Sequence, residues 1–390
     1  MDRKEVKIDM LKYGMVGGSL KAFIGEVHRK AIGFDTRAQL VSGCFSTDNR
    51  LNCDTAETYK IDKDRVYDDY KEMAKSEAFR DDKIDFVVIT TPNHLHYDVA
   101  KAFLQADISV VCEKPLCFEV EQAEELNLIA QQRNLVLGLT YTYTGYTMTK
   151  VMREMVLNGA IGDIVSVNAE YAQEWLIDQL GYSDSDTSKL SVWRMEPKFS
   201  GASNCVGDIG THIESTVHYI TGLRIKRLLA TTNNFGRQLD LNANIIVEYD
   251  NGANGAYWCS QVAAGKLNGL VVRIYGSEGS LEWEQHFPDY IRYTPKGKPT
   301  QILSRGCGYF AVESASCSRI PPGHPEGLYV AFANIYRNII TYIIQKKEGQ
   351  VIEGSNPDFT SGQEGIDGVK FVHAVVESSQ NNSAWVELIK

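Results

Sequence analysis

Two short segments of the 390-residue chain carry side chains suited to proton and charge transfer. Lys114 stands between an apolar run and Pro115, where an ammonium group could polarise a substrate oxygen. An ion pair with Glu113 is the alternative role for this lysine. Asp208 and His212 are spaced i, i+4 on a predicted helix, so they share one face. The carboxylate could orient the imidazole as a general base.

The Asp208–His212 pair has two further interpretations, a metal site or a buried hydrogen bond. No third ligand follows at helical spacing, so we expect no metal at this position. A separate apolar stripe packs the helix, and it consists of Ile209, Ile213, Val217 and Ile220.

A glycine-rich turn closes the first apolar run of the chain. Gly17 and Gly18 let backbone N–H groups approach a pyrophosphate at the start of the next helix. The fit to the GxGxxG pattern is imperfect, because Ser19 takes the second glycine position and Ala22 the third. The position of the turn favours a dinucleotide site, with a purely structural turn as the alternative.

The end of the second apolar run bears on the choice between NAD and NADP. An acid for the ribose diol of NAD is usual there, but Phe45 occupies the place. Ser46 and Arg50 follow, and a hydroxyl with a guanidinium could hold a 2′-phosphate. A solvated loop with a helix cap is an equally good interpretation, so NAD or NADP remains open.

Polar residues also follow the third and fourth apolar runs, at positions where open α/β sheets bind ligands. We expect this group to contact the cofactor: Thr91, Pro92, Asn93, His96, Glu113 and Lys114.

Short buried runs alternate with helical patterns over the first 140 residues. The predicted strands are 12–16, 39–45, 85–90, 108–112 and 135–140, and the predicted helices are 20–32, 70–79, 94–106 and 119–133. Continuous apolar runs are typical of strands buried on both faces of a parallel sheet. The pattern predicts a doubly wound, dinucleotide-binding α/β domain of the Rossmann type.

The rest of the chain predicts an α+β domain with a large open, mostly antiparallel sheet. Its helices are expected at 148–158, 209–221, 329–346 and 366–378, and its strands at 164–172, 227–234, 243–249, 255–262, 269–275 and 280–285. We therefore divide the chain into residues 1–143 for the dinucleotide and 144–390 for substrate binding and oligomerisation. The last helix could pack back on the first domain.

Composition narrows the class of partner. The 50 acidic residues outnumber the 40 basic ones, which argues against nucleic acid or an anionic membrane. Residues 1–10 show no signal-peptide core, and no apolar run approaches the ~18–20 residues that span a bilayer. The eight cysteines include no CxxC pair, which favours free thiols. We expect a cytoplasmic protein with a small-molecule substrate.

Together these motifs resemble the Gfo/Idh/MocA family of oxidoreductases. The resemblance rests on Gly17–Gly18, Thr-Pro-Asn-x-x-His at 91–96, Glu-Lys-Pro at 113–115, Asp-x-x-x-His at 208–212 and Gly-Ser-Glu-Gly-Ser at 276–280. It implies a Rossmann domain, a second domain whose open sheet makes oligomer contacts, and NAD(P)-dependent oxidation of a sugar, polyol or glycoside alcohol. The family's catalytic lysine, aspartate and histidine fall on Lys114, Asp208 and His212.

Aromatic residues could line a sugar pocket beside Asp208 and His212, because their flat faces pack on sugar C–H groups. The candidates are Tyr141, Tyr143, Trp175 and Trp193 together with Arg194. A core or interface role is the alternative for each aromatic side chain. Two other functions stay open: transient use of bound NAD for elimination or epimerisation, and a non-catalytic dinucleotide sensor. We expect a homodimer or homotetramer joined through the second sheet.

Overall fold

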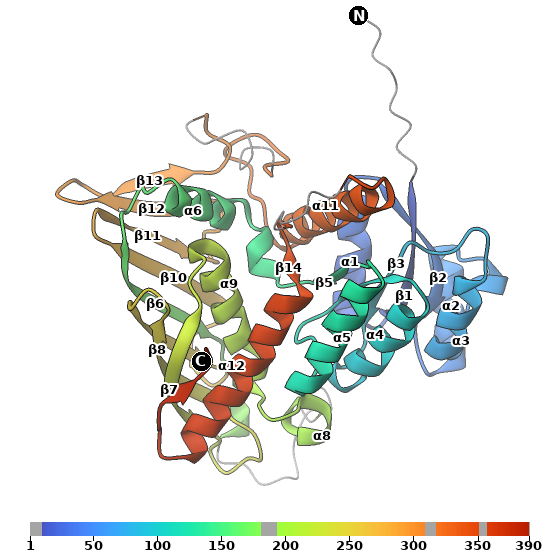
Figure 1. Ribbon diagram of the computed structural model, residues 1–390, viewed down its shortest axis with the longest axis horizontal. Helices are drawn as coiled ribbons and strands as arrows, with labels where there is room; N and C mark the ends of the chain where they lie inside the picture. The colour runs from blue at the N-terminus through green and yellow to red at the C-terminus, as the bar shows by residue number, and fades with distance from the viewer. Residues whose placement is uncertain (1–9, 181–192, 309–316, 351–356, 390) are drawn as a thin grey trace, which may run out of the picture. The chain divides into compact units, whose positions relative to one another are not determined.

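The computed structural model describes residues 10–180, 193–308, 317–350 and 357–389. The chain forms two compact units. Unit 1 comprises Met1–Leu116, Glu121–Thr140 and Phe332–Gln363, and unit 2 comprises Cys117–Val120, Tyr141–Ala331 and Glu364–Lys390. Each unit is built on its own sheet (Figure 1).

Unit 1 contains a six-stranded sheet in the order β14-β5-β4-β3-β1-β2. Its strands are β1 (Leu11–Gly17), β2 (Ala38–Cys44), β3 (Phe86–Thr90), β4 (Ser109–Cys112), β5 (Leu137–Leu139) and β14 (Thr360–Ser361). β1 to β5 are parallel, and β14 runs antiparallel to β5. Every residue of β3 and β4 is buried, as the continuous apolar runs predict. The predicted Rossmann-type sheet is confirmed.

The helices of unit 1 connect its parallel strands, except for the last one, which comes before the antiparallel strand β14. They are α1 (Phe23–Gly33), α2 (Asn49–Tyr59), α3 (Tyr70–Ala78), α4 (His96–Gln105), α5 (Val120–Gln132) and α11 (Leu328–Lys347), with short 3-10 turns η1 (Lys63–Arg65) and η2 (Asn93–Leu95). Sequence analysis missed α2. Its buried residues are Asn52, Thr55 and Ala56, so it carries no apolar stripe for a helical pattern to reveal.

The observed units differ from the predicted division at residue 143. Helix α11 and strand β14 lie in unit 1, although the prediction placed all residues after 143 in the second domain. Apolar side chains of α11 are buried, including Ile335, Ile339 and Ile343, and a Cβ on Gly138 of β5 would lie 3.0 Å from Ile339. The final helix, in contrast, belongs to unit 2.

Unit 2 contains a nine-stranded sheet in the order β13-β12-β11-β10-β6-β9-β8-β7-β15. The strands are β6 (Ile164–Ala172), β7 (Ile225–Asn233), β8 (Asn242–Tyr249), β9 (Asn254–Ser260), β10 (Gly269–Gly276), β11 (Gly279–Glu284), β12 (Tyr290–Pro295), β13 (Gln301–Ser304) and β15 (Val386–Glu387). Only the β6–β9 pair is parallel among these neighbours, which confirms the mostly antiparallel sheet. The β12–β13 hairpin was not predicted.

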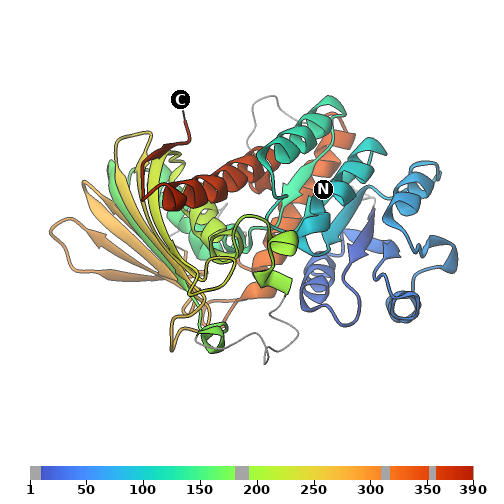
Figure 2. The ribbon, with the colours of Figure 1, turned by 90° about the horizontal axis from the view of Figure 1, so that it is seen from below.

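Helices cover one face of the second sheet (Figure 2). They are α6 (Thr147–Leu157), α9 (Thr211–Thr221) and α12 (Gly362–Gln380), and α8 (Pro197–Ser200) is a single turn. Alternate strand residues such as Ile245, Val247, Val272 and Ile274 join Ile213 and Val217 of α9 in one core. Helix α9 is thereby fixed on the sheet, and this helix carries His212. In the described part of the chain, no helix is long and apolar enough to cross a membrane.

Candidate active site

The glycine turn after β1 in unit 1 lies against the end of β3. Gly17 and Gly18 have φ angles of 82° and 74°, which glycine adopts without steric cost. A Cβ atom on Gly17 would stand 2.9 Å from backbone atoms of Thr90, and one on Gly25 would stand 2.2 Å from Cα of Gly18. Gly25, and not Ala22, therefore supplies the close helix–turn contact. A tight glycine turn between a strand end and a helix is the kind of backbone that can cradle a phosphate.

Ser19 takes the place of the motif's second glycine and is nearly buried. Its carbonyl oxygen accepts a hydrogen bond from the backbone N–H of Ala22 at 2.8 Å. The next residue, Leu20, donates its N–H to the hydroxyl of Thr55 in α2 at 3.3 Å. The serine is thus part of a turn that is tied to a second helix.

The loop after β2 leads directly into α2. Phe45 is buried, so its ring cannot take the place of a ribose-binding acid. Ser46 accepts a hydrogen bond from the backbone N–H of Asp48 at 3.1 Å, and Asp48 caps α2. The side chain of Arg50 is 92 % exposed, with a carboxylate oxygen of Asp54 at 3.9 Å. The predicted helix cap is present, and the guanidinium stands in solvent where an anion can reach it.

Three strand ends meet at one edge of the sheet. Gly17 lies opposite Thr90 in the register of β1 and β3, and β4 ends beside β3 at Cys112. The glycine turn, Thr91 and Lys114 therefore leave the sheet at neighbouring positions. The hydroxyl oxygen of Thr91 is buried and has no hydrogen-bond partner in the described part of the chain. A buried hydroxyl without a partner is costly unless a ligand or water satisfies it.

His96 connects two of these strand ends. It is fully buried, with Nδ1 2.7 Å from the carbonyl oxygen of Pro115 and Nε2 3.0 Å from that of Thr91. Burial lowers the pKa of His96. Its ring nitrogens contact protein carbonyls, so this side chain shapes the loops on either side. Asn93 opens the turn η2 between them, and Pro92 is exposed.

The carboxylate of Glu113 is held by protein donors. Oε1 accepts from Nε2 of His28 at 2.8 Å and from the hydroxyl of Thr140 at 2.7 Å, and Oε2 accepts from the N–H of Lys114 at 3.2 Å. Burial alone would raise the pKa of Glu113. The hydrogen bonds and charges of His28, Thr140 and Lys114 lower it to about 2. A fixed anion therefore stands directly before Lys114.

Asp208 lies in the π-helical turn η6 (Val206–Gly210) of unit 2, directly before α9. Its Oδ1 pairs with a guanidinium nitrogen of Arg194 at 2.8 Å, and its Oδ2 accepts from Nε2 of Gln261 at 2.9 Å. π-Helical turns are frequent at functional sites. The pair of Asp208 and Arg194 was not expected, although both residues were predicted to be in the site.

Three tyrosine rings surround the imidazole of His212, which is 7 % exposed. The ring centroids lie at 5.6 Å for Tyr141, 5.0 Å for Tyr143 and 5.9 Å for Tyr171. Such apolar surfaces exclude water and strengthen nearby electrostatic interactions. Tyr143 is itself buried, so it contacts the histidine from the core.

A chain of hydrogen bonds links Tyr143 to Trp175. The Tyr143 hydroxyl lies 2.6 Å from that of Tyr171, which donates to Oδ1 of Asn268 at 2.6 Å. Gln173 donates to the same oxygen at 2.7 Å and accepts from the indole N–H of Trp175 at 2.9 Å. Trp175 is 43 % exposed and can therefore meet a ligand. Separately, Trp193 opens the turn η5 (Trp193–Met195).

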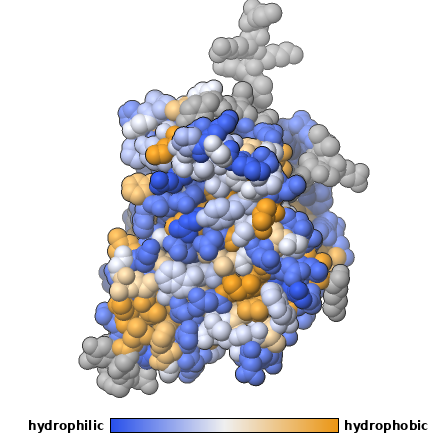
Figure 3. Space-filling view, turned by 90° about the vertical axis from the view of Figure 1, so that its left-hand side faces the viewer, coloured by the Kyte–Doolittle hydropathy of each residue, from blue (hydrophilic) through white to orange (hydrophobic). Residues whose placement is uncertain are grey.

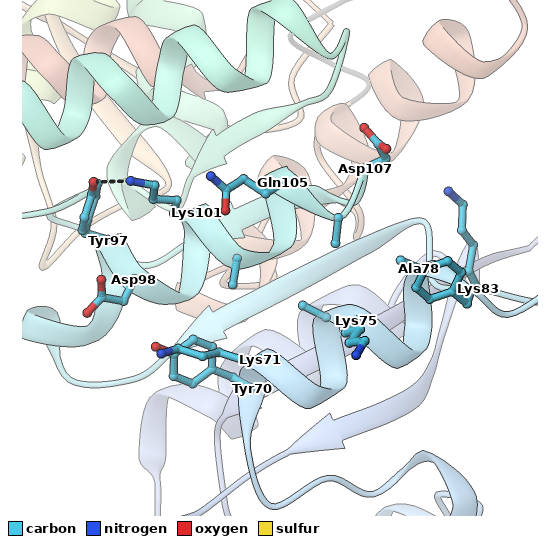
Figure 4. A pocket seen from close by; sticks show the side chains of 14 residues that line it. Tyr70, Lys71, Lys75, Ala78, Lys83, Tyr97, Asp98, Lys101, Gln105 and Asp107 are labelled. Carbon is cyan, nitrogen blue, oxygen red and sulfur yellow. Dashed lines mark hydrogen bonds between the residues drawn. The ribbon is translucent and has the colours of Figure 1, made fainter.

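A hollow in unit 1 lies apart from these residues. It measures about 750 Å³ and lies between α3 and α4, with Lys71, Lys75, Lys83 and Lys101 among its lining residues (Figure 4). Of the described residues that line it, none is a predicted site residue. Among the described residues of the whole chain, no group of three or more His, Cys, Asp or Glu could hold a metal.

Sequence analysis missed three side chains that hold the site residues in place. His28 and Thr140 bind Glu113, and Gln261 binds Asp208. A polar residue within an apolar segment was the available signal, for example Gln261 directly after strand β9.

Comparison with known proteins gives matches to both units. Residues 11–141 match the oxidoreductase family with an NAD-binding Rossmann fold, and residues 149–282 match the GFO/IDH/MocA C-terminal domain. The chain is 34 % identical over 386 residues to the uncharacterized oxidoreductase YfiI of Bacillus subtilis (strain 168), covering 97 % of this chain and 96 % of that protein.

Solved structures show the same arrangement of elements. An inositol dehydrogenase homolog from Azotobacter vinelandii complexed with NAD⁺ is 33 % identical, with a TM-score of 0.90 and 97 % of each chain covered. Its complex with NADH and myo-inositol gives a TM-score of 0.88, with the same identity and coverage.

A further relative by sequence is a levoglucosan dehydrogenase from Pseudarthrobacter phenanthrenivorans (strain DSM 18606 / JCM 16027 / LMG 23796 / Sphe3). It is 28 % identical over 236 residues, covering 54 % of this chain and 58 % of that protein.

Proposed function

Because the chain belongs to the Gfo/Idh/MocA family of oxidoreductases, with an NAD-binding Rossmann domain, we propose that it is a dehydrogenase of CH–OH groups. The reaction is reversible hydride transfer between a nicotinamide and a secondary alcohol carbon of a sugar, inositol-like polyol or glycoside. The observation that carries the proposal is the meeting of the Gly17–Gly18 turn, Thr91 and Lys114 at one sheet edge. A dinucleotide site and a cationic catalytic group then share that edge.

The residues of unit 1 fit a dinucleotide. Gly17 and Gly18 form a tight turn at the strand end, in which a Cβ atom would clash with Thr90 or Met15. Thr91 offers a buried hydroxyl that has no hydrogen-bond partner among the described residues. Ser46 and Arg50 stand at the end of β2, where a 2′-phosphate would bind. When bound, the nicotinamide accepts or returns the hydride. NAD is the cofactor of the family domain, and we propose that this loop also tolerates NADP.

Three side chains perform the acid–base and electrostatic work in this proposal. The ammonium group of Lys114 stabilises negative charge on the substrate oxygen as its proton leaves. His212 accepts that proton, and Asp208 stabilises the resulting imidazolium. The tyrosines around His212 keep water from the imidazole. Glu113, held by three donors, keeps the turn that carries Lys114 in one conformation.

We further propose that a neutral polyol fits the second unit better than a phosphorylated one. The charge of Arg194 is paired with Asp208, so it is not free for a phosphate. Trp175 offers an exposed aromatic face, and Gln173 holds its indole N–H by a hydrogen bond. The relative solved with myo-inositol agrees with this chemistry. Tyr143 is buried and contacts His212 from the core, and the side chain of Trp193 lies outside the described part of the structure.

The experiment is a screen for NADH formation with purified protein, NAD, and a panel of inositols, sugars and glycosides. Stoichiometric NADH with one of the CH–OH compounds supports a dehydrogenase. Conversion of substrate without net NADH and without added cofactor would favour transient use of bound NAD. Cofactor binding with no conversion of any compound would favour a sensor.

We also propose a homodimer or homotetramer that is joined through the outer face of the second sheet. In the described chain, the helices of unit 2 cover the opposite face (Figure 2). Apolar patches lie among hydrophilic residues on this side of the molecule (Figure 3), and the exposed large hydrophobic residues of these strands include Val165, Ile246, Tyr275, Tyr290 and Ile302. Ile302→Glu should dissociate the assembly in light scattering, whereas Lys75→Glu in the α3–α4 hollow should not. A monomeric wild-type protein with full activity would contradict the assembly.

A further inference from the structure

We propose that Gln261 is a positioning residue that fixes the carboxylate of Asp208 for the reaction. The inference rests on the proposed function, because it gives Asp208 a catalytic task. Gln261 follows β9, is fully buried, and donates from Nε2 to Oδ2 of Asp208 at 2.9 Å. A buried amide that touches a site carboxylate is well suited to hold that carboxylate in one rotamer.

The backbone of Gln261 is clamped on both sides. Its N–H donates to the carbonyl oxygen of Leu241 at 2.9 Å, and its carbonyl oxygen accepts from the N–H of Leu176 at 3.0 Å. The side chain thus starts from a fixed point between two segments of unit 2. These two backbone hydrogen bonds therefore fix the position from which the side chain extends toward Asp208.

Asn204 determines which way the amide of Gln261 faces. Nδ2 of Asn204 donates to Oε1 of Gln261 at 2.7 Å, so the amide oxygen of Gln261 is already used as an acceptor. Its Nε2 is left to point at Asp208. A rotated amide would face a donor with a donor and a carboxylate with an oxygen, which costs two hydrogen bonds. We call the hydrogen-bonded pair of Asn204 and Gln261 the relay. It presents an N–H donor to Asp208.

Asp240 anchors the far end of this relay. Its Oδ1 accepts from the N–H of Asn204 and its Oδ2 from the N–H of Val206, both at 2.9 Å. Val206 is the first residue of the π-helical turn that carries Asp208. The same carboxylate therefore fixes both the backbone N–H of Asn204 and the backbone that precedes Asp208. Backbone and side chain of the site aspartate are positioned together.

The relay also defines what surrounds Asp208. Arg194 holds its other oxygen, at 2.8 Å from Oδ1. Tyr171 and Cys205 are among the titratable groups whose charges interact with Asp208, with Asp240 beyond Cys205 and His212 one helical turn further along. Arg194 and Gln261 between them satisfy both oxygens as acceptors. The arrangement favours the ionised carboxylate that a positively charged His212 requires.

Two substitutions replace a hydrogen-bond donor of the relay with an acceptor, each at a different residue. Gln261→Glu replaces the donor with a second carboxyl group against Asp208. Asn204→Asp leaves Gln261 in place but replaces the donor to its Oε1 with an acceptor, which favours turning the amide oxygen toward Asp208. In both variants the acidic limb of the kcat/KM profile should move to higher pH, because two acceptors then compete for one proton. We expect kcat at neutral pH to fall about tenfold, with the NAD dissociation constant unchanged within twofold.

Controls separate positioning from structure. Gln301→Glu makes the same chemical change on exposed strand β13 and should leave kcat and the pH profile at their wild-type values. Thermal unfolding of each variant reports any loss of stability. Should Gln261→Glu fail to fold, Asn204→Asp decides the question, because Gln261 itself is unchanged there.

The outcomes distinguish a failure of the positioning role of Gln261 from a failure of the proposed function. Activity is measured with the most active compound of the panel and NAD. If Asp208→Asn keeps wild-type activity, Asp208 has no catalytic task and the proposed function loses that residue. If Asp208→Asn is inactive while folded Gln261→Glu and Asn204→Asp keep the wild-type pH profile and kcat, the positioning role of Gln261 is overturned and the proposed function stands.

Discussion

Nε2 of His28 lies 2.8 Å from Oε1 of Glu113, which links the first helix of unit 1 to the end of strand β4. The other ring nitrogen of His28 contacts the hydroxyl of Tyr336 in helix α11. A segment that is 308 residues from His28 in sequence is thus connected, through His28, to the turn before Lys114. The place of α11 in unit 1 follows from contacts of this kind, and so does the ionisation of Glu113.

The Glu113 site predicts an acid-sensitive contribution to stability. The pKa of Glu113 is lowered from 4.5 to about 2 in the folded protein, so its contribution is present above pH 4.5 and is lost as the pH falls toward 2. Glu113→Gln should cost about 2 kcal/mol of unfolding free energy at neutral pH, and less at the acidic end. Denaturant unfolding at several pH values measures this difference. A mutant whose deficit is constant over that range would contradict the role of the charge.

Substitution of Lys114 should separate chemistry from cofactor binding. Lys114→Met should reduce kcat on the order of 10²–10³-fold, because an ammonium aimed at a developing negative charge is lost. NAD affinity should stay within a few-fold, which fluorescence titration can check. Lys75→Met removes a lysine from the separate α3–α4 hollow and serves as the matched control. Near wild-type turnover of folded Lys114→Met would remove this lysine from the mechanism.

Arg50 should distinguish the two cofactors. Its guanidinium is 92 % exposed and stands at the loop where a 2′-phosphate would bind. We expect wild-type protein to bind NADP, and Arg50→Ala to weaken NADP about tenfold while NAD changes little. Calorimetric titration of both cofactors against wild type, Arg50→Ala and Lys75→Ala tests this. Equal losses for the two cofactors, or no binding of NADP to wild type, would contradict the assignment.

Glu214 should make the protein less stable as the pH rises. Burial, with help from Asp367 and Glu364, raises its pKa from 4.5 to about 8, while Arg224 acts in the opposite direction. The unfolded state therefore ionises first, and stability is lost between pH 4.5 and about 8. Glu214→Gln should stabilise the protein by on the order of 1–2 kcal/mol at the upper end of that range and not below it. Thermal melts at both ends, with Glu57→Gln as an exposed control, show whether the gain depends on pH.

The strand ends of unit 1 could be predicted because buried parallel strands leave a plain sequence signal. Val87, Val88, Val110 and Val111 are fully buried in continuous apolar runs, and the polar residues that follow necessarily lie at the sheet edge. Lys114 was found in this way. The GxGxxG pattern was less reliable, since only the structure shows that Gly25 makes the close contact with Gly18.

Long-range contacts could not be predicted from the same patterns. The apolar stripe of α11 shows that the helix has a packing face, but it does not say which sheet that face covers. The spacing of Asp208 and His212 assumes a regular α-helix, whereas the π-turn Val206–Gly210 precedes α9. Gln261 stands in an apolar segment, and its partners are 53 and 57 residues away in sequence.

The central claim is that this chain moves a hydride from a secondary alcohol carbon, with His212 as the proton acceptor. The most direct test follows deuterium from inositols and sugars that carry it on their CH–OH carbons, using mass spectrometry of the recovered cofactor. We predict deuterated NADH with at least one compound, at a rate that rises with pH, and loss of both the rate and its pH dependence in His212→Ala. Unlabelled cofactor with every compound, from protein that binds NAD, would contradict hydride transfer. A pH dependence that persists in His212→Ala would contradict the role of the histidine.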